Sequence, residues 1–317
     1  MLSRIANSLF WMGRYIERSE HLARYTKVHY FSALDAPQAQ NKEALLTSIL
    51  KNAGLDYLYH KDYPTVNEQA VIFYIALDLK NPFSIVANIN FARENARGAR
   101  DSITTELWEA INKYYHYAND IAFQSFEPDM TYDLTQTMID NCNIIKGLID
   151  NTMVHNDAWH LISLGLHIER AIQIISIIKS KCEDIANVGN TDVDKSIENY
   201  HWPILLKSAE SFDMCNRYYK ASPSRENALE FLILNEEFPK SISYNLNCAY
   251  YHLQKIISFK NGRSKDKFIF TVGKLLYTFK YMTIEEILAK DINVFLSDSL
   301  SAIVKTAGEF EKEYLSY

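Results

Sequence analysis

Residues 3–31 read SRIANSLFWMGRYIERSEHLARYTKVHYF, and this stretch decides the fold. It contains no proline, and its apolar residues recur at every third or fourth position. This spacing predicts one long helix whose apolar seam packs against another helix. The seam consists of Leu2, Ile5, Leu9, Met12, Ile16, Ser19, Ala23, Thr26 and Tyr30.

A second stripe on the same helix is polar and aromatic, and it lies about 200° around the helix from the first. A solvated face more often carries Lys and Glu than Trp, Tyr and Arg. We therefore expect this face to be half-buried or to contact a ligand. Its members are Arg4, Asn7, Trp11, Arg14, Arg18, His21 and Tyr25.

Part of this helix recurs later in the chain. Residues 12–19 read MGRYIERS and residues 164–171 read LGLHIERA, an offset of 152 residues. A glycine weakens a helix, and charge is costly to bury, so both features need a structural or functional reason. The repeat predicts two related long helices, each bringing a Glu-Arg pair to a similar place. The recurring residues are Gly13, Ile16, Glu17 and Arg18, then Gly165, Ile168, Glu169 and Arg170.

Composition favours an all-α protein. The 317 residues include 9 Gly and 7 Pro, and 48% are hydrophobic, so helix breakers are few and a core is available. We predict a single helical-bundle domain over residues 1–317, built from long antiparallel helices. The repeat leaves open an organisation into two related halves. The motif-bearing helices are predicted near residues 3–31, 84–126 and 156–188.

Shorter elements follow from local signals. Two helices are predicted within residues 32–82, the second with a capping box at Thr65–Glu68. A single helix is predicted over 192–219. Ser222-Pro223 suggests a cap before 223–234, Thr283–Glu286 forms a further capping box, and 260–267 resembles a flexible loop.

Charge and hydropathy exclude several classes. The net charge of −6 argues against a nucleic-acid partner. No uninterrupted apolar run approaches the roughly 20 residues that span a bilayer, and charges interrupt the N-terminal segment, so we expect neither a membrane span nor a cleaved leader. The four cysteines are widely separated, which favours reduced thiols and a cytoplasmic protein.

The strongest candidate site is the segment ARENARGARD at residues 92–101. On one continuous helix, Arg93, Arg97 and Arg100 would share a face, where they repel one another unless acids or an anion lie opposite. Arginine suits bidentate binding of carboxylate or phosphate. Three readings remain open: an anion-binding site, a solvated face, or a structural network between helices. The acids available to such a network are Glu17, Glu94, Asp101, Glu106 and Glu169.

The candidate residues fall into three groups. Acid–base or orienting roles are predicted for Glu17, Glu94 and Glu169. Anion or substrate binding is predicted for Arg4, Arg14, Arg18, Arg93, Arg97, Arg100 and Arg170. Supporting roles are predicted for Asn7, Trp11 and Asn95.

Other chemistries have little support in the sequence. No P-loop, nucleophile elbow or glycine-rich dinucleotide loop occurs. The chain has no Glu-x-x-His repeat of the kind that di-iron bundles use, so we predict no metal ligands. A carboxylate-bridged metal enzyme remains an unfavoured alternative.

Several blocks together resemble the bacterial alpha-E domain family. They are MLSRIANSLFWMGRYIERSE at 1–20, NPFSI at 81–85, ARENAR at 92–97, ELWEAIN at 106–112, the second motif, and FLILNEEFPKS at 231–241. The resemblance covers nearly the whole chain. One departure is Leu166-His167, where the family's second block usually has Gly-Arg-Tyr-like character, so an arginine at position 166 is missing.

The resemblance implies an α-helical protein that works beside a circularly permuted ATP-grasp protein, with a transglutaminase-like protein as a further partner. ATP-grasp enzymes join carboxylates to amines through acyl phosphates. The implied role is therefore a helical component of peptide or amide-bond formation that binds an anionic substrate or intermediate, with ATP and Mg held by the partner. The alternative is a non-catalytic scaffold that docks the ligase.

Overall fold

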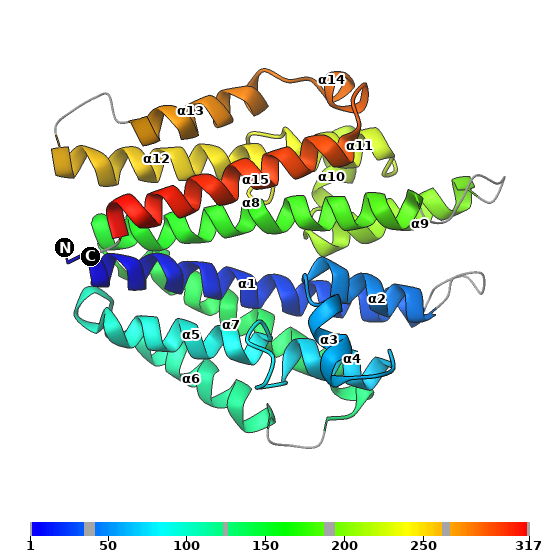
Figure 1. The fold of residues 1–317 in the computed structure, drawn as a ribbon, viewed down its shortest axis with the longest axis horizontal. Coiled ribbons are helices and arrows are strands. Elements are labelled where there is room, and N and C mark those ends of the chain that lie inside the picture. The colour runs from blue at the N-terminus through cyan, green and yellow to red at the C-terminus, as the bar shows by residue number, and fades with distance from the viewer. Residues whose placement is uncertain (1, 35–41, 123–125, 187–193, 262–266, 316–317) are drawn as a thin grey trace. The chain divides into compact units, whose positions relative to one another are not determined.

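The computed structural model describes residues 2–34, 42–122, 126–186, 194–261 and 267–315 (Figure 1). Over these ranges the chain is built from helices and contains no strand, so the prediction of an all-α fold is confirmed. The chain divides into two compact units, residues 1–166 (unit 1) and residues 167–316 (unit 2). The boundary lies inside α8 (Asp157–Ala186), whose first turns belong to unit 1.

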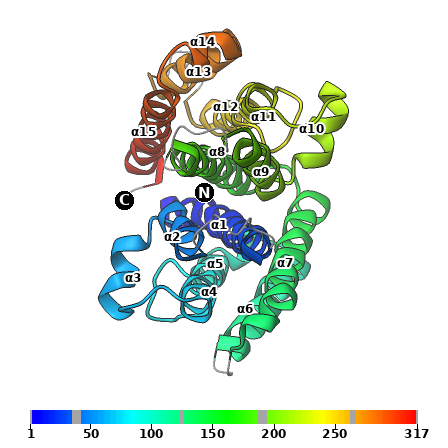
Figure 2. The same ribbon diagram turned by 90° about the vertical axis from the view of Figure 1, so that its right-hand side faces the viewer.

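Four long helices form the centre of unit 1. Helix α1 packs against α5 and α7, and α6 packs against the same two helices (Figures 1 and 2). The predicted apolar seam of α1 is its buried side, since Leu9, Met12 and Ile16 are fully buried. The bounds are α1 (Ser3–Leu34), α5 (Ile85–Gly98), α6 (Thr105–Ala122) and α7 (Thr131–Thr152).

The segment between α1 and α5 differs from its prediction. From residue 42 on, where the structure describes it, this segment holds three helices instead of two: α2 (Lys42–Asn52), α3 (Asp56–Asp62) and α4 (Glu68–Ala76). The cap of α4 is Asn67, whose Oδ1 accepts a hydrogen bond from the Ala70 amide at 2.9 Å. Asn67 directly precedes the first helical residue, so it takes the capping position expected for Thr65.

The helix predicted over residues 84–126 is also divided. Helix α5 ends at Gly98, a 3₁₀ turn follows at Arg100–Ser102, and Ile103 is extended. Thr104 then caps α6, because its Oγ1 accepts a hydrogen bond from the Leu107 amide at 3.3 Å. Arg100 therefore lies beyond α5 and does not share a continuous helical face with the arginines before it.

The described part of unit 2 contains the rest of α8 and seven further helices. Helix α12 packs against α13, and α13 packs against α15 (Figure 2). A π-helical turn at Glu311–Leu315 ends the described chain. The bounds are α9 (Asp194–Ser208), α10 (Phe212–Tyr219), α11 (Arg225–Ile233), α12 (Ile242–Asn261), α13 (Lys267–Lys280), α14 (Ile284–Leu288) and α15 (Ile292–Phe310).

Two local predictions in unit 2 need correction and one is confirmed. Residues 192–219 do not form one helix, since Glu210 has a left-handed φ of 51° between α9 and α10. Ser224 caps α11 in place of Ser222. The capping box of Thr283 and Glu286 is present at α14. Most of the loop predicted at 260–267 lies outside the described residues.

Helix α8 is the one described helix that is long and apolar enough to cross a membrane, although charges interrupt its apolar run. In the most apolar 18-residue stretch of this helix, 72% of the residues are buried within the protein. A helix that is apolar on most sides and buried is typical of a protein core, which is consistent with a soluble protein.

Candidate functional site

The repeated glycines allow two helix backbones of unit 1 to touch. A Cβ placed on Gly13 would lie 2.3 Å from the carbonyl oxygen of Ile162, and one on Gly165 would lie 2.1 Å from that of Phe10. Real Cβ atoms do not approach backbone atoms this closely. The glycines of the two motif copies therefore lie where α1 crosses the first turns of α8. A side chain at either position would force the two helices apart.

One turn further along α1 lies a buried ionic cluster, formed by Glu17, Glu20, Arg24 and Lys146. The Lys146 ammonium reaches from α7 to the Glu17 carboxylate at 3.3 Å and also pairs with Glu20. Glu20 pairs with Arg24 one turn along its own helix as well. The side chains of Glu17 and Glu20 are 4% and 1% exposed, so both carboxylates lie inside unit 1.

The buried ionic cluster brings two carboxylates together with an ammonium and a guanidinium. Removing one partner of a buried ion pair is strongly unfavourable, because the other charge keeps the cost of its burial and loses that contact. The arrangement therefore braces α1 against α7. It also places the first motif glutamate where substrate has little access.

A cysteine, Cys142, lies beside the buried ionic cluster. Burial, followed by the negative charge of Glu20, raises the pKa of the Cys142 thiol to about 12. A thiol with that pKa stays protonated near neutral pH and is a poor nucleophile. The neighbouring hydroxyls of Ser19 and Tyr114 share a hydrogen bond of 2.8 Å, and burial raises the pKa of Tyr114 well above its usual value.

Glu20, Arg24 and Lys146 were not among the predicted site residues. A signal for Lys146 does exist in the sequence, because it continues a stripe of α7 whose other members, such as Met138 and Cys142, are fully buried. A lysine on an apolar stripe indicates a buried partner of opposite charge. The partner itself lies more than 120 residues away in the chain, and no local pattern identifies it.

The polar stripe of α1 is half-buried and aromatic, as expected. The Arg14 guanidinium lies over the Trp11 ring at 4.4 Å, and Arg18 lies 5.7 Å from the ring of Tyr15. Trp11 in turn packs against Tyr15, and Tyr15 against Phe91 of α5. These contacts hold the arginines in place through cation–π attraction. At the start of the stripe, Asn7 is partly exposed and Arg4 is exposed.

A second group of charges lies at the surface of unit 1, on α5. Glu94 contacts Arg93 at 3.2 Å and Arg97 at 2.5 Å. The Arg93 Nε also donates to Asn112 Oδ1 of α6 at 2.7 Å. The Arg97 side chain is 66% exposed and that of Glu94 is 48% exposed, so both meet solvent. We call Arg93, Glu94, Arg97 and Arg100 the surface cluster.

Two aromatic rings of α6 support the surface cluster. The Arg93 guanidinium lies 4.3 Å from the Tyr115 ring and 5.6 Å from that of Trp108. Arg100, although it lies beyond α5, lies 5.8 Å from the same Trp108 ring. Both arginines therefore lie beside Trp108, although they do not share the continuous helical face that was predicted. Asn95 is occupied within α5, where its side chain donates to the Phe91 carbonyl at 2.8 Å.

The second motif copy continues into unit 2. The Glu169 side chain accepts a hydrogen bond from Gln173 Nε2 at 2.8 Å, and Arg170 donates to the Pro239 carbonyl at 3.4 Å. His167, at the departure from the family pattern, contacts Asn245 Oδ1 through Nδ1 at 2.8 Å and stacks on His252. Within this unit, the copy is thus anchored to α12 and to the turn before it.

The structure separates Glu17 from the predicted charges of α5 and of the turn after it. Arg93, Glu94, Arg97 and Arg100 come together at the surface, whereas Glu17 lies in the buried ionic cluster. Among the residues that the structure describes, no group of three or more His, Cys, Asp and Glu side chains is arranged to hold a metal ion. The site residues and their roles remain predictions.

The profile of a known family extends over almost the whole chain. This family, Alpha-E, is described as a predicted alpha-helical domain with a conserved ER motif, and it matches residues 1–315. The chain belongs to the Alpha-E family. In this Alpha-E protein the Glu-Arg pair occurs at 17–18 and at 169–170. In both copies the glutamate is buried, 3% and 1% exposed, and the arginine is partly exposed.

Curated relatives of this Alpha-E chain include uncharacterised proteins of Mycobacterium bovis and of two strains of Mycobacterium tuberculosis. Each is 20% identical over 316 residues, which covers 95% of this chain. The chain spans about a third of the length of these relatives, since the match covers 35% of each. No solved structure matches the chain.

Proposed function

We propose that this Alpha-E protein is the helical component of an ATP-dependent amide-bond-forming system, and that its surface cluster holds an anionic group of the substrate or of an acylated intermediate. The observation that carries the proposal is an exposed face of unit 1 on which Arg93 and Arg100 both lie beside the Trp108 ring. Arg97, on the same helix as Arg93, pairs there with Glu94. An ATP-grasp protein would supply ATP, Mg and the activation of the carboxylate.

The geometry suits a carboxylate or phosphate ligand. Trp108, Tyr115 and Asn112 hold the Arg93 guanidinium in place, so little side-chain freedom is lost when an anion binds. Arg97 pairs with Glu94 at the surface, where such pairs contribute only about 0–1 kcal/mol. An incoming anion can therefore displace Glu94 from Arg97 and take a charge-assisted, bidentate position.

The role proposed for Glu94 is to orient Arg93 and Arg97 until the anion arrives. Glu17 has a different proposed role, because its carboxylate is buried and paired with Lys146. It would position α1 through the buried ionic cluster. The contribution of this chain to the reaction would be the positioning and charge stabilisation of a group activated elsewhere.

The test uses a circularly permuted ATP-grasp protein, the partner that the family resemblance implies. The two proteins would be co-expressed, and ATP-dependent amide-bond formation would be followed by ADP release and by mass spectrometry of the product. We expect Arg97→Ala and Arg93→Ala to lower the rate at least about tenfold, the loss of about one charge-assisted contact. The matched control is Lys113→Ala, which removes an exposed cation of α6. Equal rates for Arg97→Ala and the wild type would reject the anion site.

A second candidate function is a non-catalytic scaffold that docks the ligase. The length of the relatives favours it, because their match to this chain leaves about two-thirds of each relative for other components. In that case partner binding and ligase activity would both survive Arg97→Ala. Withholding the Alpha-E chain would still lower the ligase rate.

A further inference from the structure

The helices of the second half of the chain repeat the order of those in the first half. Each series starts with a long helix that carries one motif copy, α1 with 32 residues and α8 with 30. The fourth helices, α4 and α11, have 9 residues each and begin 157 residues apart. The fifth helices, α5 and α12, also begin 157 residues apart. The offset is thus constant through two helices and the turn between them.

The turn before each fifth helix has the same sequence pattern and the same cap. Residues 81–92 read NPFSIVANINFA and residues 238–249 read FPKSISYNLNCA, with six of twelve positions identical. Ser84 caps α5, where its Oγ accepts a hydrogen bond from the Ala87 amide at 3.2 Å. Ser241 caps α12 in the same way, since its Oγ accepts from the Tyr244 amide at 3.0 Å.

A buried asparagine in the first turn of each fifth helix extends this resemblance. Asn88 and Asn245 are 1% and 0% exposed. Asn88 Nδ2 donates to the carbonyl of the capping Ser84 at 2.8 Å. Asn245 Nδ2 donates to the carbonyl of the capping Ser241 at 2.6 Å. Asparagine is seldom fully buried, so the same polar contact at both places is not a general result of helix packing.

The turn between the second and third helices is repeated as well. Gly54 lies between α2 and α3 with a φ of 69°, and Glu210 lies between α9 and α10 with a φ of 51°. In both turns the amide of the next residue donates to the carbonyl five residues before it at 2.8 Å. A left-handed backbone is uncommon outside glycine. Its recurrence 156 residues along, with the same hydrogen bond, shows that the two turns are built alike.

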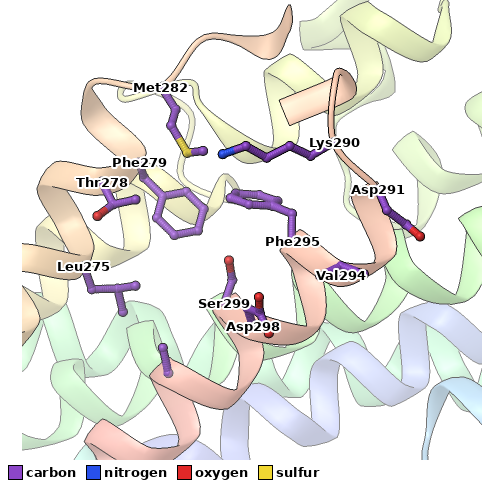
Figure 3. Close-up of a pocket in the computed structure, with 11 residues that line it drawn as sticks. Leu275, Thr278, Phe279, Met282, Lys290, Asp291, Val294, Phe295, Asp298 and Ser299 are labelled. Atoms are coloured by element: carbon purple, nitrogen blue, oxygen red, sulfur yellow. The ribbon is translucent and has the colours of Figure 1, made fainter. Parts of the chain in front are cut away.

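The last two helices of each series share a register. Helix α6 packs against α7, and α13 packs against α15, where Figure 3 shows Phe279 and Phe295 facing each other. An offset of 161 residues aligns the buried stripes of both pairs. On α6 and α7 the aligned positions are Leu107, Ile111, Ala118, Thr131, Thr135, Met138, Cys142 and Ile149. On α13 and α15 they are Phe268, Val272, Phe279, Ile292, Leu296, Ser299, Ile303 and Phe310.

The glycine crossing within unit 1 is reciprocal. A Cβ on Gly13 would meet the Ile162 carbonyl, and a Cβ on Gly165 would meet the Phe10 carbonyl. The two glycines are 152 residues apart, and so are Phe10 and Ile162. Contacts in which equivalent residues exchange places are typical of a twofold arrangement of identical partners.

We infer that the chain is a tandem duplication of one seven-helix module. The first copy runs from α1 to α7 and the second from α8 to α15, with α14 as an addition before the last helix. The offset grows from 152 to 156, 157 and 161 residues along the chain, so short insertions between helices account for the differences. Packing rules favour similar helical bundles, but they do not specify a capping serine, a buried asparagine and a left-handed turn at equivalent positions.

The duplication separates positions that build the module from positions that belong to one copy. The capping serines and the buried asparagines build the module. The surface cluster does not, because the second copy has uncharged residues at the matching positions of α12. At the offset of 157 residues, Arg93, Glu94 and Arg97 correspond to Tyr250, Tyr251 and Gln254. The surface cluster is therefore a specialisation of the first copy.

A second difference between the copies lies beside the buried asparagines. Asn245 Oδ1 contacts His167 Nδ1 at 2.8 Å. Because Asn245 Nδ2 donates to two backbone carbonyls, Oδ1 is the acceptor and His167 Nδ1 carries the proton. In the first copy Tyr15 occupies the position of His167, and Asn88 Oδ1 has no hydrogen-bond partner in the part of the chain that the structure describes. If the copies are equivalent, Tyr15→His supplies the missing donor.

The experiment is a double-mutant cycle of Tyr15→His and Asn88→Leu. Unfolding in urea would be measured at pH 8, where an imidazole with the ordinary pKa of about 6.5 is neutral. We expect Asn88→Leu to change the effect of Tyr15→His on the unfolding equilibrium constant by at least about fivefold, as the loss of one buried hydrogen bond would. The matched control is Tyr15→Phe, which has no ring N–H and should show no such coupling.

Nitrogen-15 NMR of the imidazoles gives a second readout that needs no change at Asn88. We expect the Nδ1-protonated tautomer for His167 in the wild type and for the imidazole that Tyr15→His introduces. This tautomer, with coupling to Asn88→Leu, supports the duplication. Equal coupling for Tyr15→His and Tyr15→Phe would overturn it. If Asn88→Leu does not fold, the tautomer in Tyr15→His decides alone, and protonation at Nε2 overturns the inference.

Discussion

Unit 1 holds two clusters of opposite charges that look alike in the sequence and differ in the structure. The buried ionic cluster pairs Glu17 and Glu20 with Lys146 and Arg24 inside the helical bundle. The surface cluster pairs Glu94 with Arg93 and Arg97 in contact with solvent. Both contain adjacent acidic and basic residues on long helices. What separates their roles is burial.

The difference matters because the energy of an ion pair depends on its surroundings. Buried charges cannot exchange a partner for water, so the cluster holds one geometry and α1 with it. Surface pairs are worth about 0–1 kcal/mol and exchange readily with water or with a ligand. The same residue types therefore make a brace in one place and a binding surface in the other. Four experiments can break or sharpen this comparison.

The largest effect is expected from Lys146→Met, which keeps the length of the side chain and removes the charge. Glu17 and Glu20 would lose the ammonium that pairs with both of them. We expect a loss of about 3–5 kcal/mol in the free energy of unfolding, measured by urea denaturation followed by circular dichroism.

The control for this substitution is Lys113→Met, at an exposed position of α6, which should change stability by less than about 0.5 kcal/mol. A second step tests the cause. Adding Glu20→Gln to Lys146→Met removes one of the stranded carboxylates and should restore part of the loss. A loss below about 1 kcal/mol for Lys146→Met would show that the cluster is not a brace.

Gly13→Ala should come next, because the added Cβ meets the Ile162 carbonyl and only a movement of α1 from α8 can relieve the overlap. We expect a loss of about 3 kcal/mol, the upper part of the range for overpacking. Gly147→Ala in α7 is the matched control, with nothing within 4 Å of the new Cβ. It should stabilise the protein by about 0.5–1 kcal/mol through helix propensity. Equal effects at both glycines would contradict the close crossing.

These glycines also show how far a sequence pattern can be interpreted. The repeat predicted two related helices, and it indicated that each glycine has a structural or functional role. Periodicity predicted the end of α1 to within three residues of the observed end. Periodicity is a local property of the chain. Pairing of Lys146 with Glu17 is not local, since 129 residues separate them, so the sequence alone did not connect them.

The surface cluster was predicted in part. Arg93 and Arg97 share a helix with Glu94, as the spacing indicated. Arg100 was assigned to the same face because the segment was treated as one helix, and the break after Gly98 removes that premise. The arginine is connected to the cluster through Trp108 instead, a contact between elements that spacing along one helix does not report.

His201 extends the comparison to a buried ionisable group in unit 2. Burial, then the charge of Lys181, lowers the pKa of this imidazole from 6.5 to about 4. The folded protein therefore holds His201 neutral at pH values where the unfolded chain binds a proton. Stability should fall as the pH is lowered from about 6.5 to about 4, by about 2 kcal/mol between pH 7 and pH 5.

The measurement is the free energy of unfolding at pH 7 and at pH 5 for the wild type and for His201→Phe, which cannot take up a proton. The loss on acidification should be smaller by about 2 kcal/mol in the variant. The exposed His116, replaced in the same way, provides the control for the loss of an imidazole. An unchanged loss in His201→Phe would mean that the histidine is not held neutral.

The smallest effect on stability is expected for Arg97→Ala, and this is what makes the variant informative. The side chain is 66% exposed and its pair with Glu94 is open to solvent, so the free energy of unfolding should change by less than about 0.5 kcal/mol. The same substitution is expected to lower the ligation rate. A loss of activity without a loss of stability would show that the surface cluster binds a ligand and does not stabilise the fold. A loss of stability as large as that of Lys146→Met would show that both clusters stabilise the fold.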